Sequence, residues 1–176
     1  KVISPQINEA TIRLLNRHNI EVVIPKGINC CGSLNHHLGK SDLANETFRK
    51  NITIWYNEYL ANGLDAIISN TSGCGTTLKD YGFIFRSDED LKKKAKKISE
   101  LTKDISEYLD ENVKLNFITS KESKEYKIAY HSACSMQHGQ KIHNVPINLI
   151  KKTGNKVFDI PDGHICCGSA GTYNLL

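Results

Sequence analysis

Six cysteines are the residues with the clearest capacity for chemistry in this chain of 176 residues. They are Cys30, Cys31, Cys74, Cys134, Cys166 and Cys167, and each of the two adjacent pairs is followed directly by glycine. Thiolates are soft ligands that suit iron–sulfur clusters and zinc. A glycine after the pair lets the backbone pass close to a bulky group and adopt positive φ without penalty. The pattern therefore favours ligation of a metal or a cluster.

Other uses of these cysteines fit the spacing less well. Adjacent Cα atoms lie about 3.8 Å apart, which is below the usual range for a disulfide, and the chain shows no secretory signal. No Cys-x-x-Cys pair of a zinc ribbon occurs. A single cysteine is often an unreactive residue of the core. A Cys-Cys-Gly motif that occurs twice argues against this interpretation here. A nucleophilic Cys30 or Cys166 beside a histidine would make a thiol–disulfide enzyme, although an adjacent pair is better suited to a cluster.

A long internal match relates the two adjacent pairs. When the sequence is shifted by 136 residues, residues 24–33 (IPKGINCCGS) align without a gap with residues 160–169 (IPDGHICCGS). The helix and strand expected before each pair also correspond, with Leu14 on Ile150 and Val22 on Phe158. Such a repeat can decide the architecture of a whole fold. The chain is therefore predicted to be a duplication.

Two further kinds of site are weaker alternatives. The glycines around Cys74 and after Cys167 provide neither G-x-G-x-x-G nor a following Lys-Ser/Thr, so they do not predict nucleotide binding. Histidines near the cysteines are interpreted mostly as loop or capping residues, with metal ligation by any one of them as the alternative. These are His36, His37, His131, His138 and His164.

The net charge of +4 is modest, and much of the positive charge lies in one lysine-rich segment, residues 92–97. Apolar residues recur every three or four positions through and beyond it: Leu91, Ala95, Ile98, Leu101, Ile105 and Tyr108. This pattern predicts a buried helical stripe under a solvated lysine face. Because exposed aromatic residues are not interleaved with the lysines, nucleic acid is excluded as the main partner. No apolar stretch approaches the roughly 18 residues of a transmembrane segment, so a soluble protein is expected.

The remaining pattern alternates helices with short apolar strands. One helix is predicted from near Pro5 to Leu15 and another over 145–152. A long helix is predicted to run through Phe48 and Tyr59 and to end at Asn62-Gly63. Strands are predicted at 20–24, 65–69, 127–130 and 156–160. This alternation indicates the α/β class: two duplicated, Rossmann-like halves with short parallel sheets. Ligands of such sheets lie beyond the carboxyl ends of the strands, which is where the Cys-Cys-Gly loops are expected.

At the cysteines, the chain resembles the cysteine-rich CCG domain family of heterodisulfide reductase subunits and of the iron–sulfur subunits of glycolate and lactate oxidation. Cys134, 31 intervening residues and then Cys166-Cys167-Gly168 match its pattern. Four blocks resemble glycolate oxidase iron–sulfur subunits in particular: CCGSLNHHLG at 30–39, TSGCG at 71–75, QHGQ at 137–140 and CCGSAGTY at 166–173. Reductase-type members carry a Cys-x-x-Cys pair where this chain has the single Cys74.

The resemblance implies an electron-transfer subunit of an oxidoreductase complex that oxidises a 2-hydroxy acid, by likeness glycolate. All six cysteines would bind iron–sulfur clusters of the 4Fe–4S type, with zinc as the alternative cofactor. A flavin-containing subunit would oxidise the acid, and a quinone would be the eventual acceptor. The implied location is cytoplasmic, with peripheral attachment to the inner face of the membrane as an option. A heterodisulfide-type reductase and a zinc-stabilised interaction module without redox activity are the alternatives.

The repeat divides the chain into a first module at 1–120 and a second at 121–176. Cys30, Cys31 and Cys74 are expected to converge in the first, and Cys134, Cys166 and Cys167 in the second. The 136-residue shift maps Cys134 to three positions before Lys1, and Cys74 to position 210. We therefore expect a fragment, inactive alone, whose missing ligands and ferredoxin-like region lie elsewhere in the full-length protein.

Overall fold

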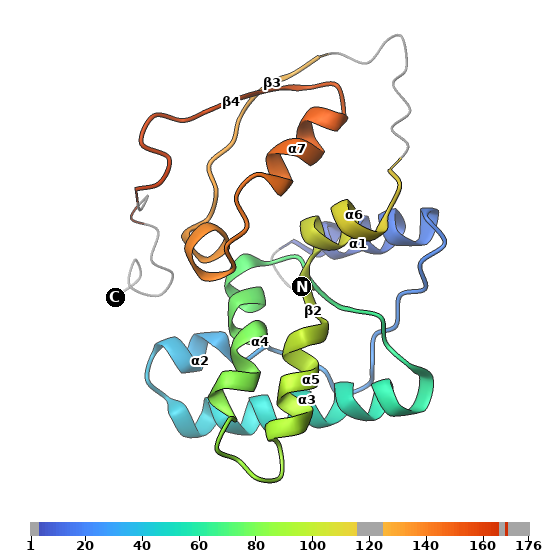
Figure 1. Cartoon of the computed structure of the whole chain (residues 1–176), viewed down its shortest axis with the longest axis vertical. Helices are drawn as coiled ribbons and strands as arrows, with labels where there is room; N and C mark the ends of the chain where they lie inside the picture. The colour runs from blue at the N-terminus through green and yellow to red at the C-terminus, as the bar shows by residue number, and fades with distance from the viewer. Residues whose placement is uncertain (1–3, 116–124, 166–167, 169–176) are drawn as a thin grey trace. The chain divides into compact units, whose positions relative to one another are not determined.

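The computed structural model describes residues 4–115, 125–165 and 168, and the chain divides into two compact units, 1–115 and 116–176 (Figure 1). Unit 1 contains α1 (Pro5–Arg17), α2 (Ser33–His37), α3 (Ser41–Asn62), β1 (Ile67–Ser69), α4 (Ser72–Ile84), α5 (Lys92–Leu101), β2 (Thr102–Asp104) and α6 (Ile105–Asn112). Unit 2 contains β3 (Lys127–Ala129), the π-helix η1 (Ser135–Gly139), α7 (Val145–Lys152) and β4 (Lys156–Phe158).

The core of unit 1 lies where α3 packs against α4 and α5 (Figure 1). Phe48 and Ile52, one turn apart on α3, are completely buried there. The Phe48 ring lies 4.8 Å from the ring of Tyr81 on α4, and Ile98 closes the core from α5. α3 ends at Asn62, where Gly63 takes up positive φ, as the sequence predicts.

Among the described residues, each unit has one pair of short parallel strands. In unit 1, β1 and β2 run in register from Ile67 opposite Thr102 to Ser69 opposite Asp104. In unit 2, β3 and β4 run from Lys127 opposite Lys156 to Ala129 opposite Phe158, with α7 as the crossover helix. Parallel neighbours need such crossovers, and helices provide them in both units. The predicted α/β class with short parallel sheets is confirmed.

The lysine-rich segment differs from its prediction in one respect. The apolar stripe from Leu91 to Tyr108 was expected to mark a helix, but the helix ends at Leu101 and β2 follows. Asp104 then caps α6: its carboxylate accepts the Ser106 N–H, and Glu107 accepts the Asp104 N–H. This capping box starts a new helix. The apolar residues of α6 keep the spacing of those in α5, so in the sequence the two helices look like one.

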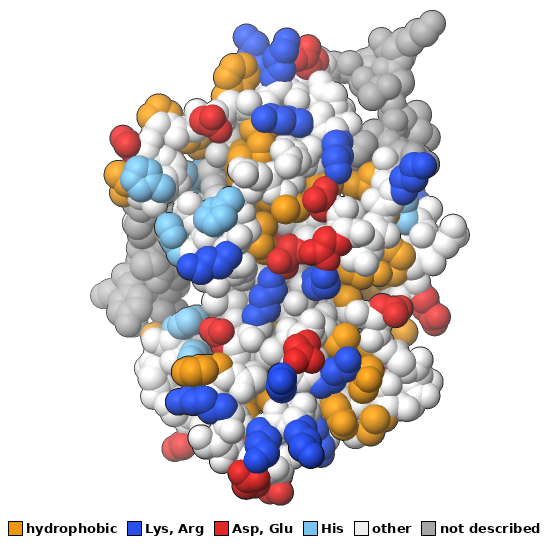
Figure 2. All heavy atoms as spheres, viewed as in Figure 1, with side chains coloured by type: hydrophobic (Ala, Val, Ile, Leu, Met, Phe, Trp, Pro, Cys, Tyr) orange, Lys and Arg blue, Asp and Glu red, His pale blue; other side chains and the backbone are white. Residues whose placement is uncertain are grey.

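Lysines of α5 form an ion pair and a cation–π contact with other side chains of unit 1. Lys92 pairs with Glu89 at 2.6 Å, and Lys97 lies over the ring of Tyr59 at 4.8 Å. On the face shown in Figure 2, basic and acidic side chains are interspersed. The segment is thus the solvated face of a packed helix, as predicted.

The strand predicted at 20–24 is wrong, because these residues form an extended segment outside any sheet. Val23 and Ile24 are 46% and 59% exposed. In the repeat alignment this segment corresponds to β4, which pairs with β3 in unit 2, whereas the described strands of unit 1, β1 and β2, pair with each other. Among the described residues, the segment therefore has no strand to pair with.

Three of the repeat's elements can be compared directly. Shifted by 136 residues, α7 corresponds to residues 9–16, which lie within α1. Gly32 and its counterpart Gly168 both have positive φ, +82° and +78°. In contrast, the Cys30–Cys31 pair follows the extended segment rather than a strand end.

Within the described ranges, no helix is both long and apolar enough to cross a membrane.

Candidate cysteine-rich site

Gly32 shapes the Cys-Cys-Gly turn of unit 1, which lies between the extended segment and α2. Its φ of +82° favours glycine, and a Cβ built there would lie 2.6 Å from the ring of Phe48. The turn therefore sits directly on the core of unit 1, and a larger residue at this position would require Phe48 to shift.

Cys31 and Cys74 meet in unit 1 although 43 residues separate them. Cys74 lies in the first turn of α4, just beyond the carboxyl end of β1, and its Sγ is 2.9 Å from the Sγ of Cys31. Both are free thiols, and Cys31 is buried. Cys30 is exposed, and its Sγ accepts the Gly32 N–H at 3.4 Å. Thiols from two distant segments are thus brought to one place.

The contact between Cys31 and Cys74 makes the two thiols unequal. The shared hydrogen bond, together with burial, raises the pKa of Cys31 far above its ordinary value of 9.0. The same hydrogen bond lowers the pKa of Cys74 to about 7, against the opposing effect of burial. Near neutral pH, Cys74 therefore carries thiolate character while Cys31 donates its proton, and a thiolate is the form that binds metal.

Two buried polar side chains hold the backbone of the turn. Asn51 on α3 donates its amide to the Cys30 carbonyl at 2.8 Å, and Tyr81 on α4 donates its hydroxyl to the Cys31 carbonyl at 2.7 Å. Asn51 is 2% exposed and Tyr81 is fully buried. Burial raises the pKa of Tyr81 beyond its ordinary range, so this hydroxyl keeps its proton.

Sequence reasoning did not identify Asn51 and Tyr81. One signal was present: Asn51 occupies the core-facing side of a helix between Phe48 and Ile52. A polar residue at such a position needs a buried partner. The sequence does not reveal which carbonyl is the partner, because it lies 21 residues away.

A second set of hydrogen bonds joins the two cysteine-bearing segments. The Thr77 hydroxyl of α4 donates to the Ser33 hydroxyl at 2.9 Å, and Ser33 donates to the Gly73 carbonyl at 3.4 Å. Ser33 follows the Cys-Cys-Gly turn, whereas Gly73 directly precedes Cys74. These bonds hold the start of α2 against the start of α4.

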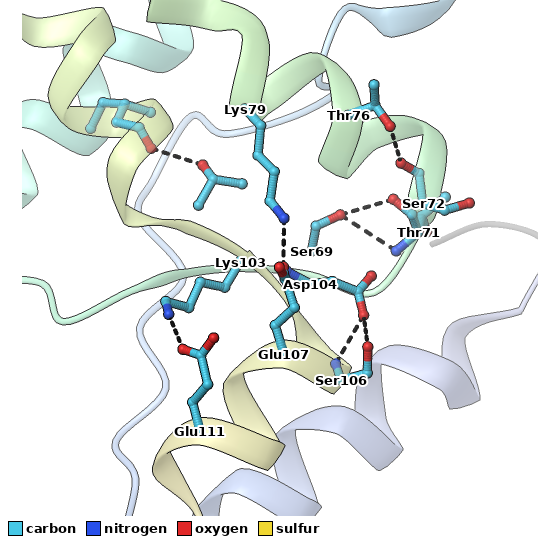
Figure 3. A network of polar contacts seen from close by, with 12 residues as sticks. Ser69, Thr71, Ser72, Thr76, Lys79, Lys103, Asp104, Ser106, Glu107 and Glu111 are labelled. Carbon is cyan, nitrogen blue, oxygen red and sulfur yellow. Dashed lines mark hydrogen bonds and ion pairs between the residues drawn. The ribbon is translucent and has the colours of Figure 1, made fainter. Parts of the chain in front are cut away.

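A polar network near the carboxyl ends of β1 and β2 connects α4, which carries Cys74, to α6 (Figure 3). Lys79 of α4 donates to Glu107 of α6 at 2.5 Å, and the Ser69 hydroxyl donates to the Thr71 carbonyl at 2.9 Å. Lys103 and Glu111 form a further ion pair. The helix that carries Cys74 is therefore anchored at the strand ends, where a ligand of a parallel sheet is expected.

In unit 2, the structure places Cys134 at the start of η1, while Cys166 and Cys167 lie outside the described residues. Their expected meeting with Cys134 therefore stays a prediction. Gln137, which is 8% exposed, donates to the Ser132 carbonyl at 3.3 Å and to the Gly163 carbonyl at 3.5 Å. It joins the segment before Cys134 to the segment before Cys166.

Cys31 and Cys74 bring two possible thiolate ligands together in unit 1. Across 4–115, 125–165 and 168, no three Cys, His, Asp or Glu side chains surround a point that could hold one metal ion. A cluster occupies more space, and Cys31 and Cys74 would have to separate from their present contact to ligate different irons. A Cβ on Gly73, beside Cys74, would meet no atom within 4 Å, so the backbone next to this thiol is not tightly packed.

Comparison with known proteins places these cysteines in a family. The model of the cysteine-rich CCG domain matches residues 1–79 and 128–175. The chain is 37% identical over 173 residues to the glycolate oxidase iron–sulfur subunit of Escherichia coli (strain K12), covering 98% of this chain and 42% of that protein. It is 30% identical over 172 residues to the probable glycolate oxidase iron–sulfur subunit of Bacillus subtilis (strain 168), covering 96% and 37%.

A lactate utilization protein A of Anoxybacillus flavithermus is 26% identical over 171 residues, covering 96% of this chain and 68% of that protein. The chain thus spans about two fifths of the length of the glycolate oxidase subunits it matches. A search of solved structures finds no match.

Proposed function

This chain belongs to the cysteine-rich CCG domain family, and on that premise we propose that it is part of an iron–sulfur electron-transfer subunit of a 2-hydroxy-acid oxidising complex. The observation that carries the proposal is the contact of Cys31 with Cys74, because it joins two of the matched cysteine segments at one partly buried place. The match to glycolate oxidase iron–sulfur subunits makes glycolate the proposed substrate of the whole complex.

Two sets of cysteines would hold the clusters. Cys30, Cys31 and Cys74 form the proposed set of the first module, residues 1–120. Cys134, Cys166 and Cys167 form the set of the second module, residues 121–176. Each set would be completed by one cysteine elsewhere in the full-length protein, at the positions to which the repeat maps. A 4Fe–4S cluster, when bound, would accept and release one electron at a time.

The residues of this chain would hold and tune such clusters rather than bind the acid. Burial of Cys31 and the amide hydrogen bond to the Cys30 sulfur would contribute to the reduction potential of a bound cluster. A flavin-containing subunit would oxidise the acid, and the electrons would pass through this subunit towards a quinone. The proposed location is the cytoplasm, at or near the inner face of the membrane.

The test is the visible spectrum and metal content of the full-length protein, purified without oxygen. The proposal predicts a brown protein with iron and sulfide, whose visible absorption bleaches on reduction by dithionite. A colourless protein that contains only zinc would contradict the proposal and favour the zinc-stabilised module. Electron transfer from the flavin subunit, measured after the subunits are mixed with glycolate, tests the assignment to the complex separately.

A further inference from the structure

The two peptide groups of the Cys-Cys-Gly turn are each held by one buried donor. Asn51 Nδ2 reaches the Cys30 carbonyl at 2.8 Å, and Tyr81 Oη reaches the Cys31 carbonyl at 2.7 Å. The two donors are also close to each other, at 3.5 Å between Asn51 Nδ2 and Tyr81 Oη. They come from different helices, so both peptide groups are fixed relative to the core of unit 1.

The Tyr81 hydrogen bond has a consequence at sulfur because a peptide group is planar. The Cys31 carbonyl and the Gly32 N–H are the two ends of one such plane. Tyr81 holds the carbonyl end, and the N–H end points to the Cys30 Sγ at 3.4 Å. Rotating this plane would break both hydrogen bonds together. The orientation of the amide at the Cys30 sulfur is thus determined by a hydroxyl on α4.

The surroundings leave Tyr81 little freedom. Its side chain is fully buried, and its ring packs on Phe48, which in turn closes against the backbone of Gly32. The same ring therefore supports the turn from below while its hydroxyl orients the Cys31–Gly32 peptide.

We propose that Tyr81, assisted by Asn51, is a positioning residue that orients the Gly32 amide towards the Cys30 sulfur. This orientation would adjust the reduction potential of a cluster bound by that sulfur. Hydrogen bonds to the sulfurs of a cluster favour its more negative, reduced form and raise its reduction potential. The effect on potential rests on the proposed function, whereas the orientation of the amide does not. Neither residue would ligate the cluster itself.

Tyr81→Phe is the decisive variant, because it removes one hydroxyl and leaves the packed ring in place. Tyr59→Phe is the matched control, since the Tyr59 ring packs on Lys97 and Tyr56 away from the turn. In iron-free full-length protein labelled with ¹⁵N-glycine, we expect the Gly32 amide to exchange with solvent at least tenfold faster in Tyr81→Phe. Tyr59→Phe should leave its exchange rate unchanged.

The second readout is the midpoint potential of the cluster-loaded full-length protein. Tyr81→Phe should shift one cluster to a more negative potential while iron content stays at the wild-type level. Asn51→Leu, with the exposed Asn57→Leu as control, should act in the same direction and replaces Tyr81→Phe if that variant does not fold. The proposal is overturned if both variants keep the wild-type exchange rate at Gly32 and the wild-type potentials, and only their melting temperature falls. Tyr81 and Asn51 would then contribute only to the packing of the core. If the wild-type protein holds no cluster, the proposed function fails, and Gly32 exchange alone decides the positioning role.

Discussion

Gly32 in unit 1 and Gly168 in unit 2 occupy matching positions of the repeat and have nearly the same backbone conformation, with φ of +82° and +78°. Their surroundings differ. A Cβ on Gly32 would strike the Phe48 ring, whereas a Cβ on Gly168 would meet no described atom within 4 Å. The glycine that follows each Cys-Cys pair therefore takes the same left-handed backbone conformation in both halves of the repeat.

The burial of the two units shows the same contrast. Unit 1 has a core of fully buried side chains from α3, α4 and α5, into which Cys31 is drawn. Among the described residues of unit 2, Ile142 is the buried hydrophobic residue, and Phe158 of β4 is 49% exposed. The core of unit 1 thus positions its thiols, whereas the described part of unit 2 provides little comparable support.

The largest expected effect is the formation of a disulfide in unit 1. In the iron-free chain, oxidised glutathione should join Cys31 to Cys74 and release two molecules of reduced glutathione, because the two sulfurs are already in contact. Peptide mapping without reduction measures the link. Cys30→Ser should retain it and Cys31→Ser should abolish it. A wild-type link from Cys30 to Cys74 in comparable yield would contradict the geometry of the site.

The next effect is the loss of stability when the support of the turn is removed. Phe48→Ala should cost about 3–5 kcal/mol, because it empties a fully buried site. Phe83→Ala, at a residue that is 66% exposed, should change stability by no more than about 0.5 kcal/mol. Phe158→Ala tests unit 2 and should cost clearly less than Phe48→Ala. Urea unfolding gives the three values, and an equal loss at Phe48 and Phe158 would remove the contrast between the units.

Substitution of the two repeat glycines should have smaller effects on stability. Gly168→Ala should cost about 1–2 kcal/mol, the penalty for a left-handed residue with a Cβ. Gly32→Ala should cost more, since Phe48 must also move. Gly39→Ala is the control within unit 1, because φ is +72° there and an added Cβ meets nothing within 4 Å. If all three substitutions prove equally costly by thermal unfolding, the contact between the turn and the core is not significant.

The smallest effect is on the acidity of one thiol. In the iron-free chain, Cys74 should react with iodoacetamide with a midpoint near pH 7, because Cys31 donates a hydrogen bond to its thiolate. The rate should fall as the pH drops through this midpoint, since the thiolate is the reacting form. Cys31→Ala should raise the midpoint because it removes the hydrogen-bond donor, whereas Cys30→Ser should lower it slightly because the Cys30 charge raises the pKa of Cys74. A wild-type midpoint near 9 would show that the two thiols do not share a proton.

The sequence predicted the elements whose signals are local. The apolar spacing of α3 and the Gly63 that ends it, the segment of α7 and the positions of β1, β3 and β4 are all found. The prediction was wrong where a local pattern needed a distant partner. Residues 20–24 have the composition of a strand, but a strand exists only when another pairs with it. The break between α5 and α6 was missed because the Asp104 cap leaves the apolar period almost undisturbed.

The site divides in the same way. The repeat and the residue types identify the cysteines, since both are visible in the sequence alone. The contact of Cys31 with Cys74 and the two donors on the turn depend on how α3 and α4 pack, across 21 to 50 residues. Only the sequence position of Asn51 within an apolar stripe signals any part of this arrangement.

The iron content of full-length protein with Cys74→Ser, purified without oxygen, decides whether the contact between Cys31 and Cys74 belongs to a cluster site. We expect this variant to keep its fold by circular dichroism but to lose the iron of one cluster relative to wild type, and Cys31→Ser to lose the same amount. Iron at the wild-type level in both folded variants would show that the contact between Cys31 and Cys74 is not part of a cluster site.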